Sequence, residues 1–246
     1  NKTLGSYNVE SRSDHRYVNP QKRENYLFNS KINRIEEADF ILLIGSNPRY
    51  EATILNARIR KAYLQNKTKI ISLNDVGDLT YPYNFLDGNI ENIKKIVEGN
   101  HEVSNLIKNA KKPLIIFGQS SLKSKFAKYI FESVRSFLEK NDKMSDKWNS
   151  LNTISENAAT VGSFDLGLYK TEDGSNEVLK DLESHKFEII YLLGVDNLKF
   201  KKKNEFIIYQ GSHGDKGAEM ADIILPGAAY TEQNGYFTNL EGKLQK

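Results

Sequence analysis

Four histidines are the side chains of this sequence most readily assigned to catalysis or metal binding. They are widely separated, at His15, His101, His185 and His213. No two of them have the spacing of a pair of metal ligands. His213 and Asp215, in the turn GSHGD, could orient each other or a water molecule. Because the histidines are isolated, we expect a structural or surface role for each of them.

Several functional classes lack support in the composition and motifs. The 246 residues include no cysteine, which excludes disulfide bonds and cysteine-bound zinc or Fe–S clusters within the chain. Neither a Walker loop nor a Gly-x-Ser-x-Gly element occurs, so phosphoryl and acyl transfer are not indicated. The net charge of +3 is too small to indicate a nucleic-acid partner. No apolar run approaches the length of a membrane-spanning helix.

The elements that must position these side chains alternate between strands and helices. Mainly apolar runs predict strands at Phe40–Ile44, Lys69–Leu73, Leu114–Phe117, Phe187–Leu193, Phe206–Tyr209 and Ile223–Leu225. Four of these runs end at a glycine, namely Gly45, Gly118, Gly194 and Gly211. The recurrence predicts an α/β fold of Rossmann-like βα units in mostly parallel sheets, with right-handed crossovers.

Helical spacing of apolar residues marks the connections between the strands. The strongest helix contains Phe126, Tyr129, Ile130, Val134, Phe137 and Leu138, an aromatic stripe that we expect in the core. Further helices are predicted through Leu55–Ala62, Ile90–Val97, Val103–Ala110, Trp148–Ala158 and Val178–Leu182. We place a boundary near Ala110, which divides the chain into an α/β lobe of residues 1–110 with a polar amino-terminal segment and an α/β lobe of residues 111–246.

The turn Gly45-Ser46-Asn47-Pro48 joins the first predicted strand to a helix. Ser46 or Asn47 can cap this helix, and Pro48 suits its first turn. Helix starts of this kind can present backbone N–H groups to a phosphate. The turn lacks the full glycine fingerprint of a dinucleotide site, so a plain βα turn is favoured by the spacing alone.

The carboxyl-terminal stretch Phe206–Gln245 delivers polar turns from two apolar strands to one edge of a sheet, where ligands bind in open α/β folds. Asp215 is expected to cap a short helix at Lys216–Ala221. The pair Asn234-Gly235 predicts a terminal β-hairpin. The basic cluster Lys199–Lys203 is expected to form an exposed loop and is a candidate contact site.

Three blocks of the sequence carry a family resemblance. The longest is YQGSHGDKGAEMADIILPGAAYTEQNGYFTNLEGKLQ, and the others are ADFILLIGSNPRYEATILNARIRKAYLQ and AKKPLIIFGQSSL. They resemble, in the same order, the large Fe–S subunits of respiratory complex I (NADH:ubiquinone oxidoreductase), in the part built on the molybdopterin oxidoreductase fold. The chain begins with Asn1 rather than Met and the family continues beyond Lys246, so we expect position 1 not to be a native start.

The resemblance implies a scaffold role in the peripheral arm of complex I, which transfers electrons from NADH to ubiquinone and couples this to proton pumping. It implies no catalytic, cofactor-binding or metal-binding residue in this chain, with the Fe–S clusters and FMN elsewhere in the complex. The implied partners are other peripheral-arm subunits and the cluster-bearing amino-terminal part of the same subunit. The implied location is the matrix side of the mitochondrial inner membrane, or the cytoplasmic face of the inner membrane in a bacterium.

Two alternatives stay open. One is a fragment of a molybdopterin-dependent oxidoreductase that still binds a pterin. In that family Ser11 and Ser13 would lie in the window of the metal ligand, and Glu232, Asn239 and Glu241 near the pterin dinucleotide. The other is an independent nucleotide-binding α/β protein, which leaves the long terminal pattern unexplained.

Overall fold

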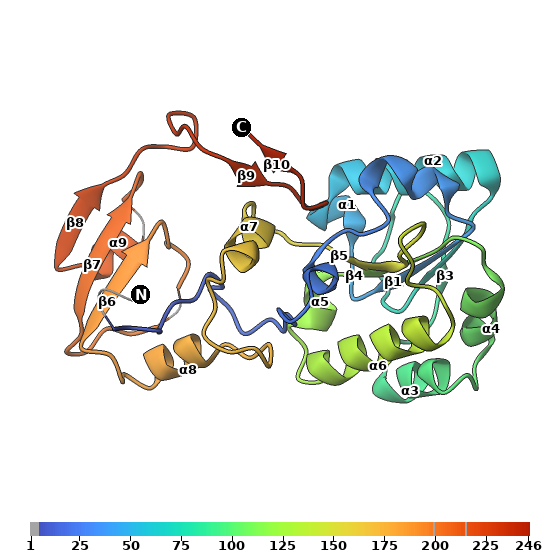
Figure 1. Ribbon diagram of the computed structural model, residues 1–246, viewed down its shortest axis with the longest axis horizontal. Coiled ribbons are helices and arrows are strands. Elements are labelled where there is room, and N and C mark those ends of the chain that lie inside the picture. Colours follow the sequence, from blue (N-terminus) through green and yellow to red (C-terminus); the bar gives the residue numbers. More distant parts are fainter. Residues whose placement is uncertain (1–4, 199, 215) are drawn as a thin grey trace.

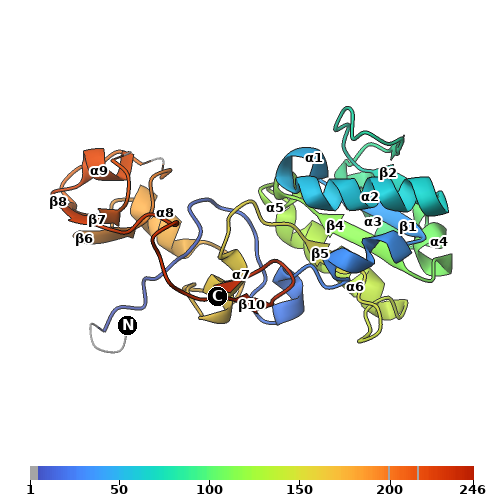
Figure 2. The ribbon, with the colours of Figure 1, turned by 90° about the horizontal axis from the view of Figure 1, so that it is seen from above.

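The computed structural model describes residues 5–198, 200–214 and 216–246. Two parallel sheets lie at opposite ends of the molecule, as Figures 1 and 2 show. We call residues 17–165, which hold the five-stranded sheet, the five-stranded lobe, and residues 176–226 the three-stranded lobe. The amino-terminal segment and helix α7 (Thr160–Asp165) lie between the two sheets in both views.

The five-stranded sheet has the order β3-β2-β1-β4-β5, and every neighbouring pair is parallel. Its strands are β1 (Phe40–Ile44), β2 (Lys69–Ser72), β3 (Asn84–Phe85), β4 (Pro113–Phe117) and β5 (Leu151–Thr153). Every residue of β1 and β4 is buried. The uninterrupted apolar runs form these strands because both of their faces are covered.

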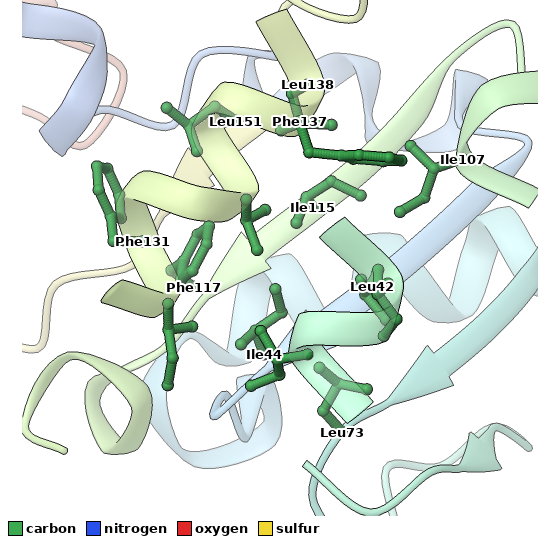
Figure 3. Packing of buried hydrophobic residues seen from close by; sticks show 14 of the residues in the cluster. Leu42, Ile44, Leu73, Ile107, Ile115, Phe117, Phe131, Phe137, Leu138 and Leu151 are labelled. Atoms are coloured by element: carbon green, nitrogen blue, oxygen red, sulfur yellow. The ribbon is translucent and has the colours of Figure 1, made fainter. Parts of the chain in front are cut away.

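Helices cover both faces of this sheet. One face packs against α3 (Ile90–Val97), α4 (Glu102–Asn109) and α6 (Ala127–Lys140), and Figure 3 shows part of this core. The opposite face packs against α2 (Thr53–Asn66) and the 3-10 helix η2 (Ile32–Glu37). Short turns of helix, α1 (Pro48–Glu51), α5 (Gln119–Leu122) and η1 (Arg23–Tyr26), complete the lobe.

The three-stranded sheet is covered on one face only, and there only over β6 and β7, since all four residues of β8 are exposed. Its order is β6-β7-β8, with β6 at Ile189–Leu193, β7 at Phe206–Gly211 and β8 at Ile223–Pro226, all parallel. Helices α8 (Glu177–Glu183) and α9 (Lys216–Met220) belong to the covered side, whose core includes Leu179, Leu182, Ile190, Leu192, Ile207 and Tyr209.

The chain returns from β8 to the five-stranded lobe and ends in a small antiparallel pair, β9 (Phe237–Thr238) with β10 (Leu244–Gln245). The Phe28 N–H donates to the Leu240 carbonyl at 2.9 Å. Beside this contact β9 lies next to α7, since a Cβ atom on Gly162 would be 3.3 Å from the Thr238 hydroxyl oxygen. The terminal pair is therefore docked on the lobe that the chain left at residue 165.

Four sequence predictions differ from the structure. Phe126 and Tyr129, in the aromatic stripe expected in the core, are 43% and 44% exposed, whereas Ile130, Val134, Phe137 and Leu138 are buried. The predicted helix Trp148–Ala158 contains strand β5 instead, which pairs with β4. A helix was predicted because a three-residue strand with buried flanking residues has the same apolar spacing as a helix. The hairpin turn lies at residues 239–243 rather than at Asn234-Gly235, since Asn239 accepts hydrogen bonds from the N–H groups of Glu241 and Lys243. The sheets also do not divide at Ala110, because β4 pairs with β1.

The remaining predictions concern the ends of the strands, the fold class, two residues that the structure does not describe, and membrane-spanning helices. The six predicted strands are present within two residues of their predicted ends, and the parallel α/β fold is confirmed. The predicted cap Asp215 and the first residue of the basic cluster, Lys199, lie outside the described residues. Among the residues that the structure describes, no helix is both long and apolar enough to cross a membrane.

Candidate functional site

The carboxyl edge of the five-stranded sheet is the place where an open α/β fold binds its ligands. Strands β1 and β4 are neighbours there, and each ends in a glycine followed by a short helix, α1 or α5. The Gly118 N–H donates to the Ile44 carbonyl at 3.0 Å, which fixes the two turns side by side. Any anion site of this lobe would be expected between these two turns.

The two glycines bring the turns into direct contact. A Cβ atom on Gly45 would lie 2.4 Å from the Ser121 nitrogen, and one on Gly118 would lie 2.3 Å from the Ser46 Cα. Gly45 also has a φ of +58°, a conformation that favours glycine. Glycine here serves the packing of one turn on the other, rather than the approach of a ligand to the backbone.

Glu51 holds both turns through its carboxylate. The Asn47 N–H donates to Glu51 Oε1 at 2.7 Å, and the Gln119 N–H donates to Glu51 Oε2 at 3.0 Å. These N–H groups stand at the starts of α1 and α5, where a phosphate would otherwise bind. At an effective dielectric constant of 20, a second unit negative charge about 4 Å away would be repelled by about 4 kcal/mol.

The serines of α5 and a neighbouring asparagine satisfy the backbone groups around this edge. Ser120 donates to the Gly45 carbonyl and Ser121 donates to the Ile44 carbonyl, both at 2.9 Å. The Gly45 N–H donates to Asn74 Oδ1 at 2.9 Å. The hollow beside these residues has a volume of about 110 Å³. Pockets for drug-sized ligands have roughly 300 Å³ or more.

Two buried polar atoms at the β1 turn have no hydrogen-bond partner among the described residues, Ser46 Oγ and Asn47 Oδ1. Asn47 is the N-cap residue of α1, but its side chain makes no capping hydrogen bond and its amide donates to the Val76 carbonyl instead. An amide oxygen needs a donor, which water supplies and an ionised phosphate does not. Asn47 Oδ1 and the Glu51 carboxylate therefore do not fit the phosphate of a pterin dinucleotide, whereas the Ser46 hydroxyl could donate to one.

At the carboxyl edge of the three-stranded sheet, the exposed turn after β7 is held by hydrogen bonds within the chain. Buried Tyr209 donates its hydroxyl to the His213 carbonyl at 2.8 Å, and His213 Nδ1 lies 2.9 Å from Ser212 Oγ. The predicted pairing of His213 with Asp215 falls outside the described residues.

The other histidines occupy separate places. His15 lies 3.0 Å from Glu183, both exposed, and His101 Nδ1 accepts from the Val103 N–H as the N-cap of α4. His185 Nδ1 lies 2.6 Å from the buried carboxylate of Glu205. Within the described part of the chain, no three acidic, histidine or cysteine side chains come together as a metal site.

The polar residues of the terminal pattern bind backbone. Glu232 accepts from the Ala229 N–H at 3.1 Å, within its own loop. Glu241 accepts from the Ile32 N–H and lies 2.9 Å from Lys243 Nζ. Burial opposes ionisation of Glu241, but the hydrogen bonds from Lys243 and Ile32 outweigh it and hold the pKa of this carboxyl below its usual value. These contacts attach the terminal pair to the five-stranded lobe.

The two serines of the suggested metal window lie in the segment between the lobes. Ser11 accepts a hydrogen bond from Ser163 at 3.0 Å. Buried Arg12, between Ser11 and Ser13, donates to the carbonyls of Gly174 and Ser175, both at 2.8 Å. The segment therefore packs against α7 and the loop that leads to the three-stranded lobe.

Sequence reasoning did not single out Glu51, which contributes most to the geometry of the candidate edge. Its only signal is its position four residues after Asn47, which lets a carboxylate in the first helical turn reach back to the helix start.

Comparison with known proteins agrees with the fold. The model of the molybdopterin oxidoreductase family matches residues 1–246. The NADH-ubiquinone oxidoreductase 75 kDa subunit of Reclinomonas americana is 39% identical over 240 residues, 97% of this chain and 34% of that protein. The mitochondrial 78 kDa subunit of Candida albicans is 41% identical over 226 residues, 91% of this chain and 30% of that protein.

A plant relative extends the match to almost the whole chain. The mitochondrial NADH dehydrogenase [ubiquinone] iron-sulfur protein 1 of Solanum tuberosum is 35% identical over 244 residues, 98% of this chain and 32% of that protein. The chain thus spans about a third of the length of these curated relatives. It belongs to the molybdopterin oxidoreductase family and is similar to the 75 and 78 kDa subunits of NADH-ubiquinone oxidoreductase.

Proposed function

We propose that this chain is a structural part of the peripheral arm of respiratory complex I and carries no redox cofactor of its own. Its similarity to the 75 and 78 kDa subunits of NADH-ubiquinone oxidoreductase supports a place in that complex. The observation that carries the cofactor-free role is the Glu51 carboxylate, which accepts from the N–H groups of Asn47 and Gln119. A negative side chain has taken the position at which the fold would bind a phosphate.

In this role the fold supplies a rigid body rather than a reaction centre. The hydrogen bonds of Glu241 and Leu240 attach the terminal pair to the five-stranded lobe, and those of Arg12 attach the amino-terminal segment to the loop at Gly174. The proposed partners are the cluster-bearing part of the same subunit and other peripheral-arm subunits. The proposed location is the matrix side of the mitochondrial inner membrane, following the mitochondrial relatives.

Native gel electrophoresis of mildly solubilised membranes tests the place in the complex. We expect the chain to migrate with the band that oxidises NADH. Migration only as a free protein would contradict membership in the complex and would favour an independent nucleotide-binding protein.

Elemental analysis of the same band tests the cofactor-free role. We expect molybdenum and oxidised-pterin fluorescence well below one equivalent per chain.

The second candidate is a fragment that still binds a pterin. The orphaned Ser46 Oγ favours it, since buried polar groups are normally hydrogen-bonded and a hydroxyl can donate to a phosphate. Stoichiometric pterin that is lost in a Ser46→Ala variant, but retained in a Ser184→Ala control far from this edge, would support the second candidate. The same result would defeat the scaffold role.

A further inference from the structure

The face of the three-stranded sheet opposite α8 and α9 is apolar and uncovered. Strand register places eight side chains on it in three rows: Ile189 with Phe206; Tyr191 with Ile208 and Ile223; Leu193 with Gln210 and Leu225. Ile189 and Leu193 are each 67% exposed, and Tyr191 is 51% exposed. We call these eight residues the open face. None of them is charged, and their one amide, Gln210, accepts a hydrogen bond from the Tyr191 hydroxyl.

The connections within this sheet cannot cover the open face. The strands follow one another across the sheet in a single direction, β6-β7-β8. Right-handed crossovers in that order place every connection on the same side, and α9, which joins β7 to β8, packs against the covered core. Covering the second face of a parallel sheet requires chain that arrives from elsewhere.

The size of the open face suits a single helix. Three strands about 4.8 Å apart and about 16 Å long present a footprint of roughly 220 Å². One α-helix, about 10 Å wide and three turns long, matches the footprint.

We propose that an amphipathic α-helix covers the open face, and that it comes from the part of the family's polypeptide that this chain does not span. Its inward stripe is aliphatic or aromatic and uncharged, to match the rows around Tyr191 and Ile208. The curated relatives are about three times as long as this chain, so they contain the sequence needed to supply the helix. The proposal rests on family membership and stands or falls independently of the scaffold role.

Photo-crosslinking in the native protein tests the proposal. The photoreactive residue p-benzoylphenylalanine replaces Tyr191, Ile189 or Leu193 in turn, and as a matched control it replaces Tyr50, which is 81% exposed on α1. After irradiation of intact cells, the crosslinked peptides are identified by mass spectrometry and aligned with the longer relatives. We expect the three open-face positions to crosslink to one helical stripe in the part of the relatives beyond this chain, and Tyr50 not to reach it.

Three results would overturn the proposal: adducts to a second copy of this chain, adducts to a different subunit, or no peptide adduct at the three positions. A charge substitution gives an independent readout. In native protein, Leu193→Glu is expected to increase cleavage by limited proteolysis at least tenfold in the three-stranded lobe, because a helix cannot bury the carboxylate. Leu166→Glu, at a residue that is 78% exposed outside the open face, is the control and should cause no increase. Equal cleavage of the two variants would count against a covering helix.

Discussion

Strands β1 and β6 are similar in sequence and differ in environment. Strand β1 reads FILLI and β6 reads IIYLL, yet β1 is buried at all five positions while β6 alternates between exposed and buried. The difference lies in what covers them, since β1 has helices on both faces and β6 on one. An apolar run therefore indicates how a strand is covered in the finished assembly, and not only within the segment that contains it.

The largest expected effect contrasts a doubly covered strand with the open face. Phe117→Ala, at a fully buried position of β4, should lower the free energy of unfolding by about 3–5 kcal/mol. Ile189→Ala, at a position of β6 that is 67% exposed, should change it by less than about 0.5 kcal/mol in the 246-residue chain. Urea denaturation followed by circular dichroism measures both, and similar losses would show that the two strands are equally covered.

A smaller effect is expected at the carboxyl edge of the five-stranded sheet. Glu51→Gln should destabilise the lobe by about 1–3 kcal/mol, because an amide can accept from only one of the Asn47 and Gln119 N–H groups through its oxygen. The fluorescence of Trp148, which packs in this lobe, reports the transition. Glu102→Gln, whose exposed side chain pairs with Lys69 in the described part of the chain, is the control and should have an effect close to zero. Equal effects would mean that the Glu51 bridge contributes no stability.

The smallest expected effect is on the stability of the three-stranded lobe as the pH falls. Hydrogen bonds from the N–H groups of Lys203 and Glu205, and then from His185, lower the pKa of Glu205 from 4.5 to about 2. The ionised form is the one bound in the folded state, so its contribution is present above pH 4.5 and is lost as the pH falls toward 2. Hydrogen exchange between pH 5 and 2.5 should show earlier opening of β6 and β7 than of β1 and β4.

A Glu205→Gln variant provides the matched control for this pH dependence. At pH 6, the amides of β6 and β7 should exchange faster in the variant than in the parent protein. The change in their exchange between pH 5 and 2.5 should be much smaller in the variant than in the parent. A pH profile unchanged by the substitution would assign the opening to other carboxyl groups.

The sequence predicted the strands well and the contacts between distant segments poorly. Apolar runs such as Phe40–Ile44 and Leu114–Phe117 predict strands because burial on two faces leaves no place for polar residues. The pairing of β4 with β1 is long-range, and no local signal marked it, so the division at Ala110 fell inside one sheet. Strand β5 was missed because three residues are too few to establish a period of two.

The glycines predicted the two turns of the candidate edge, but neither their meeting nor the chemistry of the edge. The pattern placed Gly45 and Gly118 each at the end of a strand, but in different lobes, whereas the structure pairs the two strands. Glu51 can hold both turns only because the two turns meet across the sheet. The residue spacing within one turn does not reveal that meeting. Glu241 shows the same limit, because its partner Ile32 is 209 positions away.

The contact between α7 and β9 gives the chain the topology of an insertion. The polypeptide leaves the five-stranded lobe after Asp165 and rejoins it at Phe237, where Gly162 and Thr238 are neighbours. An excursion whose two ends meet can be lengthened, shortened or exchanged without altering the path of its host. The three-stranded lobe is thus the part of this architecture that evolution can most easily replace, and the five-stranded lobe the part that such replacement leaves intact.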